Sequence, residues 1–139
     1  NSDVTVNTYR QKLQADNARE LIAQYDIVVD GTDNAAVRYV ISDVCVALGK
    51  TYVYGAICGF EGQVSVLCRG KATYRALYPE EQELKDAHAA KAVIGVTPAI
   101  VGSVEAAQVL QLICGYGEPL IDKLWTIDLR TMQTFVIRV

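Results

Sequence analysis

The sequence predicts an α/β fold of the Rossmann-like, doubly wound kind, with a mainly parallel sheet that ends in an antiparallel strand pair. Residues 27–29 form a continuous β-branched run between acidic residues, which is typical of a parallel strand buried on both faces. A helix with one apolar stripe and a second strand follow, and this order predicts a right-handed βαβ unit. Two segments with alternating apolar residues, at 125–129 and 135–139, then close the chain.

The first part of the chain is expected to hold a short strand at residues 4–6 and then a helix. Asn17 and Glu20 have the spacing of a capping box, and Leu21 and Tyr25 follow at helical spacing. This helix would lead directly into the strand at 27–29.

The βαβ unit is the clearest part of the chain. Its helix carries apolar residues at helical spacing from Val37 to Leu48, with Asp33 or Asn34 as the N-cap and Gly49 as the stop. The second strand is expected over residues 51–57. Glycines at 55, 59 and 62 are expected to interrupt the chain before a third strand at 63–67.

The remainder contains a long loop and a long helix. Residues 69–92 have no helical or strand period, and loops of this length in a compact domain are usually either functional or mobile. Thr97 and Pro98 have the types found at an N-cap and at the first helical position. The helix that they start is predicted to reach Cys114 and to be buried on all sides, because its residues are apolar or small nearly all round.

The length, charge and composition of the chain limit the class of protein to which it can belong. With 139 residues the chain is expected to form one domain, residues 1–139. A net charge of −3 without a basic cluster excludes a nucleic-acid footprint, and no apolar run approaches the roughly 20 residues of a membrane span. Four cysteines without a C-x-x-C pair predict free thiols in the cytoplasm. The chain begins at Asn1 without a methionine and is expected to be part of a longer protein.

The segment from Asp30 to Asn34 is the strongest candidate for a ligand site. It joins the carboxyl end of a strand to a helix N-terminus, where open α/β sheets bind ligands and free N–H groups favour phosphate. Asp33, at the tip of the strand, is a candidate Mg²⁺ ligand, although an N-cap role explains it equally well. Arg38 could offset phosphate charge; a surface ion pair with Asp43 or a neighbouring residue is the alternative.

These motifs resemble those of the MoeB/ThiF/HesA family of ubiquitin-activating-type adenylyltransferases. Residues 26–34, Asp-Ile-Val-Val-Asp-Gly-Thr-Asp-Asn, followed by Arg38, are similar to the family's D-x-T-D-N…R segment. The resemblance covers essentially the whole chain and identifies it as the carboxyl-terminal portion of such a domain. The other matches fall in order along the chain: Asn1-Ser2-Asp3-Val4, Gly55-Ala56, Gly62-Gln63-Val64, Val93-Ile94-Gly95, Pro98, Gly102-Ser103, Gly115-Tyr116-Gly117-Glu118-Pro119-Leu120 and Ile127-Asp128.

The resemblance implies a function. Family members use MgATP to adenylate the C-terminal glycine of a small ubiquitin-like sulfur-carrier or modifier protein, mostly by positioning and charge neutralisation. By carry-over, Asp33 would bind Mg²⁺ and the outer phosphates, with Thr32 and Asn34 beside it at the nucleotide. Arg38 would hold the nucleotide crevice and act with Asp33 in catalysis. Residues 69–92 would cross over the tail of the carrier protein, and the enzyme would be a homodimer.

Three departures from the family pattern qualify this expectation. Thr73-Tyr74-Arg75-Ala76 stands where the family has a zinc-binding Cys-x-x-Cys, and the second pair is absent, so no zinc site is expected. His88 stands where many members have a reactive cysteine, which removes the support for a thioester step but not for adenylation. The N-terminal strands and the glycine-rich phosphate loop belong upstream of Asn1.

Two expectations follow from the missing upstream part. The chain alone is expected to be inactive, and its strand at 27–29 would be a bare apolar edge that requires the upstream part or a dimer partner. The alternative function is a non-catalytic, degenerate adenylyltransferase-like subunit that acts in dimerisation or protein binding. A nicotinamide-linked Rossmann enzyme would need a G-x-G-x-x-G motif after its first strand, and the sequence has none there.

Overall fold

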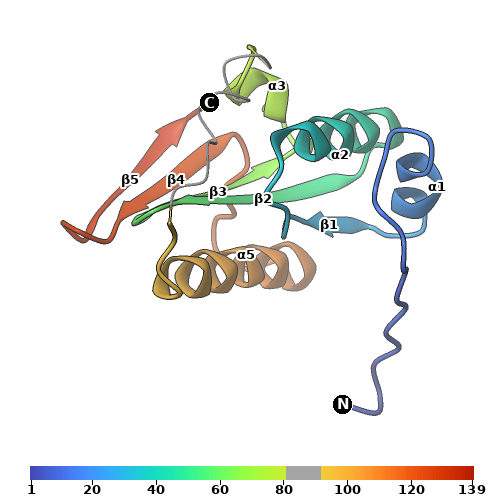
Figure 1. Cartoon of the computed structure of the whole chain (residues 1–139), viewed down its shortest axis with the longest axis horizontal. Helices are drawn as coiled ribbons and strands as arrows, with labels where there is room; N and C mark the ends of the chain where they lie inside the picture. The colour runs from blue at the N-terminus through green and yellow to red at the C-terminus, as the bar shows by residue number, and fades with distance from the viewer. Residues whose placement is uncertain (81–91) are drawn as a thin grey trace.

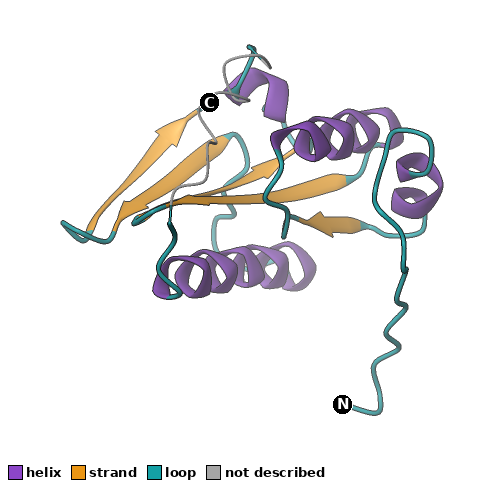
Figure 2. Ribbon diagram, viewed as in Figure 1, coloured by secondary structure: helices purple, strands orange, loops and turns teal. Residues whose placement is uncertain are grey.

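The computed structural model describes residues 1–80 and 92–139, and it contains one five-stranded sheet with helices on both faces (Figures 1 and 2). The helices α2 and α3 lie over one face, and α5 lies over the other. The elements are α1 (Ala18–Ala23), β1 (Ile27–Val29), α2 (Ala35–Leu48), β2 (Thr51–Cys58), β3 (Glu61–Leu67), α3 (Tyr74–Leu77), α5 (Val96–Cys114), β4 (Lys123–Asp128) and β5 (Gln133–Arg138).

The sheet confirms the predicted α/β fold and its antiparallel C-terminal pair. Its strand order is β1-β2-β3-β4-β5, in which β1 and β2 are parallel and the other neighbours are antiparallel. The antiparallel part therefore begins at β3, earlier than the sequence indicated. The reason is the two-residue connection Gly59-Phe60, since a link this short can join only antiparallel strands.

Of the three glycines expected to interrupt the chain, only Gly59 does so, in the left-handed conformation at φ +61°. Gly55 lies inside β2 and Gly62 inside β3. Both are needed for close packing, because a Cβ at Gly62 would lie 2.4 Å from Val101 Cγ2, and one at Gly55 would lie 2.4 Å from the carboxyl carbon of Glu105.

The N-terminal segment differs from the prediction. Residues 4–6 do not form a strand; Val4 and Val6 are exposed, and the segment extends away from the sheet in Figure 1. The capping box is also not made. The Asn17 side chain instead accepts a hydrogen bond from the Gln14 N–H and donates one to the Lys12 carbonyl. Its amide thus stabilises the turn before α1 rather than the first turn of the helix.

The helix α2 agrees with the prediction and decides between its two possible caps. Asn34 is the N-cap, and its Oδ1 accepts a hydrogen bond from the Val37 N–H at 3.3 Å. Gly49 ends the helix in the left-handed conformation. The inner face of α2 packs on β2 in a core that includes Tyr39, Cys45, Tyr52 and Tyr54.

The helix α5 is covered on one side only, so the prediction of burial all round is wrong. Its buried residues are Thr97, Val101, Glu105 and Gln108, which face the sheet, while residues on the outer side such as Ile113 are exposed. Thr97 is not the N-cap, a position taken by Gly95; its hydroxyl donates to the Gly59 carbonyl at 3.0 Å.

By length and hydropathy alone, α5 could also cross a membrane, contrary to the expectation from the sequence that no apolar run is long enough. One such helix is weak evidence for a membrane span, because helices that pack in the cores of globular folds have the same length and composition.

The loop predicted at 69–92 contains the short helix α3, which begins with Thr73 as its N-cap. Residues 81–91, including His88, lie outside the described residues. The prediction that this segment crosses over a partner therefore stays a prediction.

The strand β1 forms one edge of the sheet, as the sequence predicted for residues 27–29. Within the described part of the chain, no strand pairs with its outer side, and Val29, the last residue of β1, is half exposed. A hollow of about 330 Å³ lies beside it. Its lining is mostly apolar: Tyr9, Leu21, Ile22, Tyr25, Ile27, Val28 and Val29.

We expect the isolated chain to self-associate through this edge, and Val29→Lys to raise the monomer fraction, because a lysine on an edge strand opposes strand pairing. Sedimentation velocity measures the effect. Val46→Lys, at an equally exposed position on α2, is the control and should change little. A wild-type chain that sediments as a monomer would contradict the expectation.

Candidate functional site

The carboxylate of Asp30 is the centre of a buried polar network at the carboxyl end of β1. Its Oδ1 accepts hydrogen bonds from the Thr32 N–H and hydroxyl, both at 2.7 Å. Its Oδ2 accepts from Arg38 Nε at 2.9 Å and from the Tyr52 hydroxyl at 2.7 Å. With both oxygens occupied and no exposed surface on its side chain, Asp30 orders the turn after β1 and is not available to a ligand.

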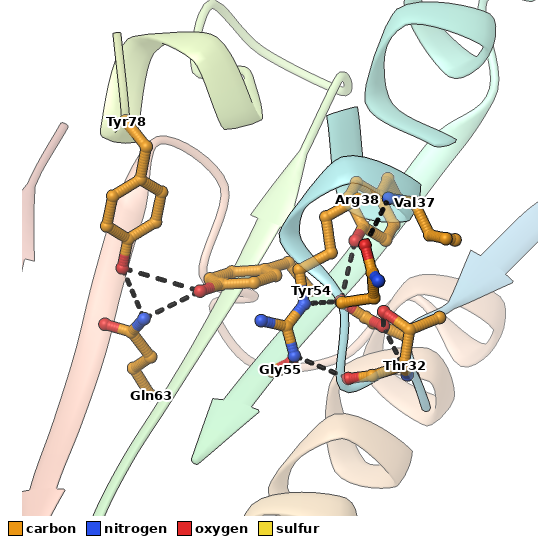
Figure 3. A network of polar contacts seen from close by, with 10 residues as sticks. Thr32, Val37, Arg38, Tyr54, Gly55, Gln63 and Tyr78 are labelled. Atoms are coloured by element: carbon orange, nitrogen blue, oxygen red, sulfur yellow. Dashed lines mark hydrogen bonds and ion pairs between the residues drawn. The ribbon is translucent and has the colours of Figure 1, made fainter. Parts of the chain in front are cut away.

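Arg38 is buried in this network and does not pair with Asp43, so the alternative of a surface ion pair is wrong. Besides its bond to Asp30, its Nη2 donates to the Thr32 carbonyl at 2.5 Å and to the Gly55 carbonyl at 3.5 Å (Figure 3). Burial acts to lower the pKa of the guanidinium, but the charge of Asp30 and the surrounding tyrosines raise it overall. Arg38 thus stays charged and ties the turn after β1 to β2.

Asp33 differs from the buried, paired side chains of Asp30 and Arg38. Its side chain is exposed, and it has no hydrogen-bond or ion-pair partner among the residues that the structure describes. The cap of α2 is provided by Asn34, which removes the structural explanation for Asp33. A free carboxylate between a strand end and a helix N-terminus fits a Mg²⁺ site of the nucleotide type, in which one or two carboxylates and phosphate oxygens share the ion.

The four predicted site residues therefore lie together where β1 ends and α2 begins, the position expected for the crevice, but they differ in availability. Thr32 is half-buried, with its hydroxyl turned to Asp30, and Asn34 is exposed but engaged in capping. Their assignment to a nucleotide, like that of Asp33 and Arg38, stays a prediction. Their geometry favours Asp33 for direct contact and gives Arg38 a role in fixing the shape of the crevice.

Glu105 lies close to this network, across β2, although it was not among the predicted site residues. Its side chain extends from α5 to Gly55 on the face of the sheet that α5 covers, and Glu105 is 7% exposed. Its Oε1 is buried without a hydrogen-bond partner in the described part of the chain. Burial raises the pKa of its carboxyl to about 7; the negative charge of Asp30 adds to the increase, and Arg38 opposes it.

A groove of about 330 Å³ crosses the outer part of the same sheet face that carries Tyr54. Strand register explains its composition, because residues directly opposite each other on neighbouring strands point to one face. Two such rows across four strands line it: Ala56, Gln63, Thr126 and Phe135, then Cys58, Glu61, Asp128 and Gln133.

Gln63 connects the groove to the crevice. Its Nε2 donates to the Tyr54 hydroxyl at 2.6 Å and also to the Tyr78 hydroxyl (Figure 3). The Tyr54 ring in turn lies 5.6 Å from the Arg38 guanidinium carbon. A continuous set of contacts therefore runs from Asp30 to the groove.

At the positions where the family has a Cys-x-x-Cys, the structure has a helix cap. The Thr73 hydroxyl accepts the Ala76 N–H at 3.2 Å, and Arg75 holds α3 against α2 through two bonds to Asp43, at 2.8 and 2.7 Å. The Tyr74 N–H donates to the Ser42 hydroxyl at 3.1 Å. Within residues 1–80 and 92–139, no group of three or more His, Cys, Asp or Glu side chains is placed to hold a metal ion.

Comparison with known proteins finds relatives over the whole chain. The sequence model of the ThiF family matches residues 1–139. The chain is 37% identical to the adenylyltransferase and sulfurtransferase MOCS3 of Arabidopsis thaliana, over 100% of this chain and 31% of that protein. It is 40% identical to the sulfur carrier protein adenylyltransferase of Thermus thermophilus, over 90% of this chain and 49% of that protein. The chain thus spans about a third to a half of these relatives.

The fold is that of MccB from E. coli. A crystal structure of MccB with MccA-N7isoASN matches 99% of this chain and 45% of that chain, with a TM-score of 0.83 and 18% identity. A crystal structure of MccB with ATP matches 91% of this chain and 40% of that chain, with a TM-score of 0.71 and 18% identity. At this identity the likeness demonstrates the fold alone.

Proposed function

This chain belongs to the ThiF family, a family of adenylyltransferases, and from this premise we propose that its parent protein uses ATP to adenylate the C-terminal glycine of a small ubiquitin-like sulfur-carrier or modifier protein. In this reaction a carboxylate oxygen of the glycine attacks the α-phosphorus, the bond to the bridging oxygen breaks, and pyrophosphate leaves. The parent protein is further proposed to be a homodimer in the cytoplasm.

The observation that carries the proposal is the free carboxylate of Asp33 at the crevice. Asn34 caps α2 and Arg38 neutralises Asp30, so Asp33 is the acidic side chain of this turn that remains available to a ligand. Mg²⁺ held there would offset the negative charge that develops on the leaving phosphates. The network of Asp30 and Arg38 keeps the turn rigid, which is the preorganisation that such electrostatic catalysis requires.

The groove supports the part of the proposal that concerns the carrier protein. It lies on the same sheet face as Arg38 and Tyr54, and its row of Ala56, Gln63 and Thr126 offers a small side chain beside two polar ones. An extended, flexible tail that ends in glycine fits this groove, because its backbone N–H and C=O groups can bind the polar side chains. We propose that the carrier's tail follows the groove to the crevice.

Carrier-dependent exchange of labelled pyrophosphate into ATP tests this function. We expect exchange by the parent protein only when the carrier is present, and none by residues 1–139 alone. Exchange by the isolated chain would contradict the second expectation, and its absence from the parent with every carrier of its organism would contradict the first. The alternative, a non-catalytic subunit that acts in dimerisation or protein binding, predicts that the parent binds a partner without any exchange.

A further inference from the structure

Glu105 is a charged residue in a position where burial makes its charge costly. It is the one charged residue of α5, and the sheet covers it. The neighbouring helix positions that face the sheet, Thr97 and Gln108, satisfy their polar groups with backbone partners. Glu105 Oε1 has no hydrogen-bond partner among the described residues. Buried ionisable groups without partners occur preferentially at functional sites, because elsewhere they only cost stability.

The surroundings of Glu105 place it across β2 from the buried Arg38–Asp30 pair. Its carboxyl group lies against Gly55, where a Cβ would be only 2.4–2.7 Å from its carboxyl atoms. The carbonyl of the same Gly55 accepts a hydrogen bond from Arg38 on the other face of the sheet. Gly55 separates the carboxyl group of Glu105 from the buried Arg38–Asp30 pair.

Two charged groups act on the Glu105 carboxyl group: Asp30, at the end of β1, raises its pKa, and Arg38, on α2, lowers it. The strand β3 faces α5 with Gly62 and Val64, which carry no charge. Because burial is the larger cause, Glu105 exchanges its proton near neutral pH.

We propose that Glu105 takes up a proton from solvent when the phosphates of the nucleotide bind where β1 ends and α2 begins, so that nucleotide binding is coupled to the protonation of this buried carboxyl group. The proposal rests on the proposed function. Its physical basis is that MgATP keeps a net negative charge. Further negative charge near the Asp30–Arg38 pair makes an ionised Glu105 more costly and a neutral one more favourable.

The sign of the pH dependence follows from this coupling. At pH 6 Glu105 is already protonated in the free protein, and binding needs no proton. At pH 8 it is ionised, and binding must first protonate it. The affinity for MgATP should therefore fall by up to about tenfold between pH 6 and pH 8. At pH 7, binding should take up about half a proton.

Titration calorimetry of the parent protein with MgATP, in excess Mg²⁺ and without carrier, measures this uptake. Two buffers that differ in ionisation enthalpy give the number of protons. Glu105→Gln, which has the same shape and no charge, should abolish the uptake and keep its affinity at pH 8. Glu118→Gln, at an exposed position, is the matched control and should behave as wild type. An infrared difference spectrum on MgATP binding should show a new protonated carboxyl group in the wild type.

The possible outcomes separate this proposal from the proposed function. Tight MgATP binding without proton uptake, or an equal loss of affinity at pH 8 in wild type and Glu105→Gln, overturns the role of Glu105 and leaves the proposed function standing. A parent protein that binds no MgATP overturns both. The wild-type measurements decide the question even if Glu105→Gln does not fold.

Discussion

Replacing Arg38 with methionine should lower the free energy of unfolding by about 3–5 kcal/mol, the usual cost of removing one partner from a buried ion pair. The Arg38 and Asp30 side chains are 6% and 0% exposed, so the Asp30 carboxylate would remain buried with only the Tyr52 hydroxyl and Thr32 as donors. Urea unfolding of the protein, followed by circular dichroism, measures the change.

Two further variants identify the cause of this loss. Arg130→Met removes exposed ion pairs with Glu61 and Asp128 and should cost at most about 1 kcal/mol. Adding Asp30→Asn to Arg38→Met removes the unpaired buried charge and should recover part of the stability. If Arg38→Met lowers the free energy of unfolding no more than Arg130→Met does, the Asp30–Arg38 pair does not stabilise the turn between β1 and α2.

Helices and strands that are specified by a pattern within one segment could be predicted from the sequence. The β-branched run of β1 and the apolar stripe of α2 are patterns within single segments, and each element formed where its pattern lies. Gly49 ends α2 because glycine adopts the left-handed conformation without a steric cost. The direction of β3 was also present in the sequence, in the two residues that separate it from β2.

The site was predicted less completely, because its contacts are not local. Arg38 pairs with Asp30, eight residues earlier and outside the helix, whereas the alternative considered from the sequence was a surface ion pair with Asp43 or a neighbour. Glu105 was missed because it is a single acidic residue in an otherwise uncharged helix. One signal could have found it: Thr97, Val101, Glu105 and Gln108 follow at helical spacing, so three polar residues of α5 share the face that the sheet buries.

The crevice itself leads to the prediction with the largest expected effect on activity. Asp33→Asn in the parent protein should lower carrier-dependent pyrophosphate exchange by about 10²–10³-fold, the usual loss when a preorganised electrostatic group is removed from a transition state. It should also weaken the dependence on Mg²⁺, since an amide is a poorer ligand for this ion than a carboxylate. Exchange rates measured over a range of Mg²⁺ concentrations test both effects.

A structural role for Asp33 would give a different result, and the structure allows the two to be separated. Because its side chain is exposed and Asn34 provides the cap, Asp33→Asn should change the free energy of unfolding by no more than about 0.5 kcal/mol. Asp26→Asn, at the other end of β1 and also exposed, is the control and should leave both exchange and stability unchanged. An Asp33→Asn variant that loses stability together with activity would show that this carboxylate supports the turn. Full exchange activity in Asp33→Asn would remove it from the nucleotide site.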